Sequence, residues 1–144
     1  MVEVFNREAL EERFGNWPSF HDSEIQAVRL NSGQQNDAGP SVELDVHVFE
    51  VERSVEGGVS FVNHSLVTMR FDGVEAVELS GFGPQNALDD LVIKDLGTAA
   101  AGAAKILVSL PSNNGLGGTF RCEEVTVLAV AEFEPGPRSV YRRP

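Results

Sequence analysis

The chain has 144 residues, of which 42% are hydrophobic, and its formal net charge at pH 7 is −11. This length favours a single domain, and this hydrophobic content excludes a chain that is disordered throughout. The 22 acidic residues outnumber the 11 basic ones, which disfavours direct binding to a nucleic-acid backbone because the protein repels phosphates. Either solubility or an acidic face that attracts a basic partner explains the charge.

The sequence shows no signal for a membrane or for export. No stretch approaches the roughly 20 consecutive apolar residues that a membrane-spanning helix needs. The first five residues lack the basic start and apolar run of a signal peptide, so we expect a cytoplasmic protein that does not bind membranes. Cys122 is the only cysteine, and the apolar/polar alternation around it predicts a buried, unreactive thiol.

A single globular domain is expected over residues 1–137, followed by a basic C-terminal tail over residues 138–144. Three of the basic residues, Arg138, Arg142 and Arg143, lie in that tail. The body shows no repeat of fixed period and no regular alternation of strands with helices, so no second domain is expected.

Residues 6–14 have the pattern of a short amphipathic helix. Asn6 is a favourable N-cap residue, and Gly15 suits the left-handed position that ends a helix. Leu10 and Phe14 lie four residues apart and share one face, so we expect this edge to dock on the rest of the protein.

The clearest strand signal lies between residues 42 and 48. Every second residue there is apolar, which predicts a strand with one face in the core: Val42, Leu44, Val46 and Val48. The residues between them are expected on a wet outer face: Glu43, Asp45 and His47. A strand over residues 24–31 precedes it, and the polar stretch 32–40 predicts a loop that joins the two as an antiparallel pair.

Further strands are predicted in the rest of the chain. Residues 67–71 alternate in the same way, Asp72-Gly73 is a hairpin signal, and residues 75–80 form the returning strand. Residues 87–95 fit both a helix and a short strand, so both stay open there. Residues 105–110 predict a strand, residues 111–118 a loop, and residues 119–133 one long or bulged strand. The expected fold class is α+β, mainly β: an antiparallel sheet or sandwich of six to seven strands with a short N-terminal helix.

No set of residues has the spacing of a catalytic or metal site. His21, Asp22 and Ser23 are the residue types of a hydrolase triad, but consecutive residues in an extended chain point to alternate sides and cannot form one array. His47 and His64 could join His21 and Asp22 as metal ligands, yet no pair of them has recognisable ligand spacing. We therefore expect no catalytic residue, no metal and no cofactor.

The stretch around Trp17, Phe20, His21 and Asp22 has two readings. In the structural one, Trp17 and Phe20 pack the helix against the sheet, Asp22 caps a turn through following backbone N–H groups, and His21 donates to a carbonyl. In the functional one, these four residues form a small aromatic and polar patch at one end of the sheet.

Three segments carry a resemblance to a known family. Gly15-Asn-Trp-Pro-Ser-Phe-His-Asp-Ser-Glu-Ile25 resembles the start of immunity protein 50-type sequences from bacterial polymorphic toxin systems. Glu78-Leu-Ser-Gly-Phe-Gly-Pro-Gln-Asn-Ala-Leu88 is similar to the middle segment of that family, and Phe120-Arg-Cys-Glu to the residues before its last strand. The resemblance implies a non-enzymatic inhibitor that binds and neutralises a cognate toxin in the producing cell.

The function hypothesis is therefore an immunity protein with a toxin partner, which the acidic body predicts to be basic. The partner-binding candidates are two sets, one at the end of the sheet and one on the acidic strand: Trp17, Phe20, His21 and Asp22, and Glu43 and Asp45. Two alternatives stay open. One is an enzyme or small-ligand domain that uses His21 and Asp22 in a pocket, and the other is an interaction module or homodimer that pairs through an exposed sheet edge.

Overall fold

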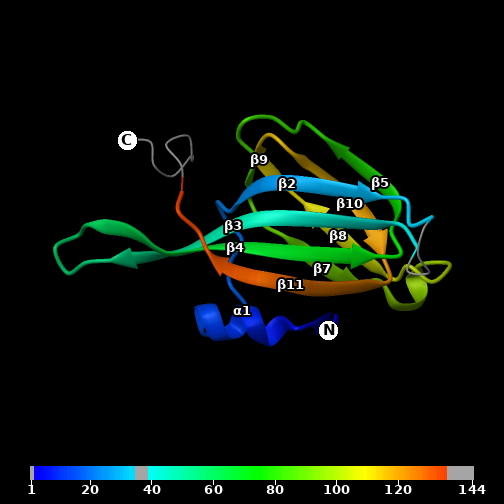
Figure 1. Cartoon of the computed structure of the whole chain (residues 1–144), viewed down its shortest axis with the longest axis horizontal. Helices are drawn as coiled ribbons and strands as arrows, with labels where there is room; N and C mark the ends of the chain where they lie inside the picture. The colour runs from blue at the N-terminus through cyan, green and yellow to red at the C-terminus, as the bar shows by residue number, and fades with distance from the viewer. Residues whose placement is uncertain (1, 35–38, 136–144) are drawn as a thin grey trace.

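The computed structural model describes residues 2–34 and 39–135 as two stacked β-sheets with one short α-helix beside them (Figure 1). The larger sheet has seven strands in the order β1 (Val4–Phe5), β11 (Glu124–Glu132), β4 (Val59–Asp72), β3 (Ser41–Arg53), β2 (Glu24–Asn31), β6 (Ala87–Leu88) and β9 (Ser112–Asn114). The smaller sheet has four strands in the order β5 (Glu75–Ser80), β10 (Gly117–Cys122), β8 (Ile106–Leu110) and β7 (Val92–Asp95). All pairs are antiparallel except β1 and β11, which run parallel. The expected mainly-β sandwich with an N-terminal helix is confirmed.

The core lies between the two sheets and uses the strand faces that the alternation predicts. The apolar positions of β3 are completely buried, as are the facing positions of β4: Val42, Leu44, Val46, Val48, Val67, Met69 and Phe71. Phe71 meets Phe120 of the smaller sheet edge-on, with 5.1 Å between the ring centroids. Cys122 is buried in the same core, where burial raises the pKa of its thiol to about 12. This confirms the expected register of β3 and the buried, unreactive cysteine.

Helix α1 (Arg7–Phe14) packs on β11 through Leu10 and Phe14, which are both buried. Gly15 ends the helix with a φ of 84°, as expected. The capping role predicted for the Asn6 side chain is wrong. Asn6 has a left-handed φ of 61°, whereas a capping residue is extended, and its amide instead donates to the carbonyl of Val127 at 2.9 Å.

The chain crosses between the two sheets at two places where the sequence predicted continuity within one sheet: the hairpin at Asp72-Gly73 and the single strand over residues 119–133. Residues 75–80 form strand β5, but β5 does not return along β4, because β3 and β11 already occupy both edges of β4. The chain turns at Gly73, which has a φ of 66°, and enters the smaller sheet. Residues 119–133 likewise form two strands in different sheets, β10 and β11, rather than one. The two crossings lie side by side, since the N–H of Glu123 donates to the carbonyl of Asp72 at 2.8 Å.

The remaining segments settle the open assignments. Residues 87–95 contain the short strands β6 and β7 rather than a helix. Part of the expected loop 111–118 forms the edge strand β9, and the stretch of small residues after β7 holds a short 3-10 helix, Gly97–Ala99. Residues 35–38 of the expected loop and the tail 138–144 lie outside the described residues. The described part of the chain contains no helix with the length and hydrophobic content needed to cross a membrane.

Strands β3 and β4 continue beyond the sandwich as a hairpin that projects from one end of the molecule (Figure 1). We call residues 49–62 of this hairpin the arm. A turn at its tip is closed by the N–H of Ser54, which donates to the carbonyl of Gly58 at 2.9 Å. The arm exposes four large apolar side chains: Val51, Val55, Val59 and Phe61.

Candidate functional site

A groove of about 360 Å³ lies between the base of the arm and the segment that follows α1. One wall comes from that segment and includes Phe14, Pro18, His21 and Asp22. The opposite wall comes from the arm and consists of Phe49, Glu50, Val51 and Phe61. We call this feature the arm groove. It brings residues from the N-terminal motif together with the projecting hairpin. Strand β2 and the first part of β3 lie between the two in the sequence.

His21 and Asp22 lie on the exposed rim of the arm groove. The Nδ1 of His21 is 3.0 Å from the carbonyl of Asp89, so the expected carbonyl partner is present. Asp22 has a left-handed φ of 64°, and its N–H donates to the carbonyl of Leu88 at 2.8 Å. Its carboxylate accepts from the amide of Asn113 at 3.2 Å, instead of from the following backbone N–H groups that the turn-capping reading requires.

The three triad-type residues do not converge. His21 Nε2 and the Asp22 carboxylate are 3.5 Å apart and both side chains are exposed, whereas Ser23 is buried. Ser23 has a structural role, since its N–H donates to the carbonyl of Phe20 and its own carbonyl accepts from Leu88. The geometry therefore presents an exposed polar pair, next to which the Ser19 hydroxyl accepts from the backbone N–H of His21 at 3.2 Å.

Trp17 and Phe20 have separate environments. Phe20 is almost completely buried and belongs to the core, which matches the structural reading of that residue. Trp17 is half-buried, and its ring centroid lies 5.8 Å from that of Phe20. The guanidinium of Arg7 lies over the Trp17 ring, 5.1 Å from the ring centroid. Trp17 lines a neighbouring hollow of about 340 Å³ together with Arg7 and residues of β1 and β7. Of the four motif residues, only His21 and Asp22 thus reach the arm groove.

The base of the arm is anchored to the end of the helix by Asn63. This residue has a left-handed φ of 57° next to a shift in the β3–β4 register between Val48 and Glu50. Its amide donates to the carbonyl of Arg13 at 2.8 Å and to the carboxylate of Glu50 at 2.6 Å. The guanidinium of Arg13 in turn donates to the hydroxyl of Ser65 at 2.8 Å. These bonds hold the two walls of the groove in a fixed relation.

His47 is completely buried, which corrects the expectation that it is solvated on the outer face. Its Nε2 lies 3.0 Å from Nδ1 of His64, and Nε2 of His64 lies 3.0 Å from the carbonyl of Phe61. A carbonyl only accepts, so neutral His64 donates to Phe61 and accepts from His47. Burial, aided by the nearby His64, lowers the pKa of His47 to about 4. Phe133, 4.5 Å away between ring centroids, covers the ring from the segment after β11.

The histidines do not assemble with the other candidate ligands into a metal site. Within the described residues, no three His, Cys, Asp or Glu side chains are grouped as metal ligands. The contact between His47 and His64 joins the core to the base of the arm.

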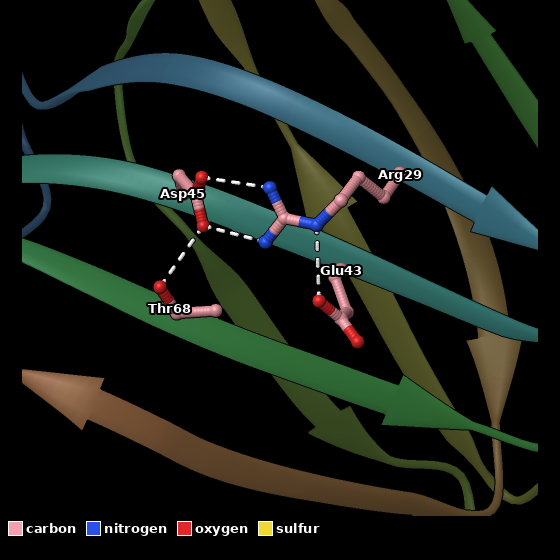
Figure 2. Close-up of polar contacts among 4 residues, drawn as sticks. All are labelled: Arg29, Glu43, Asp45 and Thr68. Carbon is pink, nitrogen blue, oxygen red and sulfur yellow. Dashed lines mark hydrogen bonds and ion pairs between the residues drawn. The ribbon is translucent and has the colours of Figure 1, made fainter.

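Glu43 and Asp45 lie on the outer face of the larger sheet and form an ion-pair cluster with Arg29 of β2 (Figure 2). The guanidinium binds the Asp45 carboxylate at two points, 2.7 and 2.8 Å, and the Glu43 carboxylate at 3.0 Å. Thr68 adds a bond to Asp45 at 2.9 Å. The bonds from Arg29 hold the pKa of Asp45 below its usual value of 3.8, while the two carboxylates raise the pKa of Arg29. Neither acid lines the arm groove, so the structure separates the two candidate sets.

The arm wall of the groove was not among the sequence candidates, although the sequence contains a signal for it. The apolar alternation that ends at Val48 slips by one position and resumes at Phe49 and Val51. The structure places the register shift of β3 at this slip. A bulge bends a strand and redirects its side chains, so the slip marks the point at which β3 leaves the core.

Comparison with known proteins now gives the family. A comparison with curated proteins finds no match, and a comparison with solved structures finds none. The family model of immunity protein 50 matches residues 6–133, which include the helix, the arm groove and every strand of both sheets except β1. The chain belongs to the immunity protein 50 family.

Proposed function

We propose that this protein binds and neutralises a cognate toxin in the cytoplasm of the producing cell, and that it does so by contact rather than by catalysis. The observation that carries the proposal is the family match over residues 6–133. The exposed position of the His21–Asp22 pair at the rim of the groove supports a binding role for the motif. The proposal assigns toxin binding to the end of the sandwich that carries the arm groove.

The two candidate sets differ in how available their charges are. Arg29 already neutralises much of the charge on Glu43 and Asp45, so a basic partner would have to compete with a bidentate ion pair there. Asp22, in contrast, has no Lys or Arg partner among the described residues: its carboxylate accepts from the Asn113 amide and lies 3.5 Å from His21 Nε2 at an exposed rim. This difference supports the groove end over the acidic strand as the contact surface.

The overall charge supports a basic toxin. A net charge of −11 attracts a basic protein over several ångströms and accelerates its association at low salt. An interface on one end of the protein also agrees with the projecting arm, since a hairpin outside the sandwich adds contact area without disturbing the core.

Co-expression tests the proposed function directly. A candidate toxin domain from a neighbouring gene is expressed alone and with this chain, and growth and complex formation by size-exclusion chromatography are measured. Restored growth and a stable complex are expected. Loss of growth in both cultures, together with separate elution of the two proteins, would refute the function.

A further inference from the structure

The arm wall of the groove is apolar and is arranged by strand pairing. Val51 and Phe61 are direct cross-strand partners, so their side chains lie on the same face of the hairpin. The Phe49 ring packs edge-on against Phe61, with 5.3 Å between the ring centroids. Val51 and Phe61 nevertheless stay 52% and 40% exposed, although each is next to apolar neighbours. This wall therefore offers a partly exposed apolar surface to the groove.

Two carboxylates line the same groove, together with the imidazole of His21, whose Nε2 lies 3.5 Å from the Asp22 carboxylate. Glu50 and Asp22 belong to opposite walls, and among the described lining residues none is Lys or Arg. Amide groups of Asn63 and Asn113 orient the two carboxylates without neutralising them. Arg53, the one basic residue of the arm, lies closer to the tip and does not line the groove.

We infer that the arm groove receives a segment of the toxin in which an apolar side chain adjoins a lysine or arginine. This inference rests on the proposed function and names the chemistry of the partner at that site. The apolar side chain packs against Phe49, Val51 and Phe61, and the cation binds between the carboxylates of Asp22 and Glu50. A volume of about 360 Å³ has room for a few side chains, so a loop or extended segment of the toxin enters rather than a folded domain.

Two kinds of substitution separate the parts of this inference. Asp22→Asn with Glu50→Gln removes both charges and keeps an oxygen that accepts from each amide, so the fold is retained. Glu78→Gln with Glu124→Gln is the matched control, because it changes the net charge equally at exposed positions outside the groove. Phe61→Ala tests the apolar wall, and Phe82→Ala, at a side chain that is 57% exposed elsewhere, is its control.

Affinity for the cognate toxin is measured by titration calorimetry, with urea unfolding of every variant to show that it is folded. We expect the Asp22/Glu50 variant to bind at least about 30-fold more weakly, since truncating one side of a desolvated charge pair has effects of that size. Phe61→Ala should bind at least about tenfold more weakly. Both controls should stay within about twofold of the wild type.

The outcomes distinguish the inference from the function on which it rests. If the wild type binds the toxin and both groove variants bind equally well, the inference is wrong and the proposed function stands. If only Phe61→Ala weakens binding, the cationic part of the inference is overturned. A second copy of the chain would be the occupant if the wild type sediments as a dimer and does not bind the toxin, and if the Phe61→Ala variant sediments as a monomer. Absence of any complex with the wild type would remove the proposed function itself.

Discussion

Replacement of Asn63 should destabilise the protein by two separable effects. Asn63 donates to the carbonyl of Arg13 and to the carboxylate of Glu50, and it does so from a left-handed backbone conformation with a φ of 57°. Asn63→Gly removes both hydrogen bonds and tolerates this conformation. Asn63→Ala removes the same bonds and adds the steric cost of a Cβ atom in a left-handed residue.

Asn63→Ala should therefore be less stable than Asn63→Gly, and both should be less stable than the wild type. A net hydrogen bond contributes about 0.5–1.5 kcal/mol and one to a charged group about 1.5–3, but Glu50 is exposed, so the lower values apply. Asn63→Gly should lower the free energy of unfolding by about 1–3 kcal/mol, and Asn63→Ala by about 1 kcal/mol more.

Urea denaturation at neutral pH, followed by circular dichroism, measures both changes. Asn16→Ala is the control, because this exposed asparagine lines the groove and should change stability by less than about 0.5 kcal/mol. Equal stability of the Gly and Ala variants would refute the conformational argument. Wild-type stability of both would refute the role of Asn63 as an anchor.

Three further predictions concern the core, the ion-pair cluster and the cysteine. Val46→Asp should prevent stable folding at room temperature, because it buries an unpaired charge in a completely buried central strand; an unchanged urea midpoint would contradict the register of β3. The pKa of Asp45 is lowered by Arg29, so its stabilising effect is complete above the unfolded value of 3.8 and is lost as the pH falls through the lower folded value. Asp45→Asn should accordingly show a shallower loss of stability below pH 4 than the wild type, and parallel pH profiles would argue against the pairing. Cys122 should resist a maleimide reagent in the native state and react in urea, because it is buried and its pKa is raised to about 12; rapid labelling of the native protein would show that the thiol is accessible.

Periodicity predicted the elements of this fold well where one strand face meets one core. The β3 alternation and the Leu10–Phe14 edge of α1 both describe surfaces that neighbouring residues bury. The same patterns could not predict which sheet a strand enters. Asp72-Gly73 signals a turn, but β5 crosses to the smaller sheet because β11, some fifty residues later, occupies the remaining edge of β4.

Burial imposed by distant segments was equally invisible in the sequence. His47 alternates with the buried valines and belongs to the outer side of β3, yet Phe133 covers it from the far end of the chain. For the candidate site, the motif pointed to His21 and Asp22 among its residues, and the structure places these two at an exposed turn. The opposite wall depended on how far β3 and β4 extend past the core, which follows from the fold of the whole sheet.

The position of β11 has a consequence for how the protein reaches its folded state in the cell. This strand lies between β1 and β4, so two strand pairings of the larger sheet need residues 124–132. While these residues are still inside the ribosome, β4 has an open edge and β1 has no partner in the sheet. The base of the arm also lacks Phe133 over His47 at that stage. Completion of the larger sheet along the β4 edge therefore comes after residues 124–132 have been synthesised.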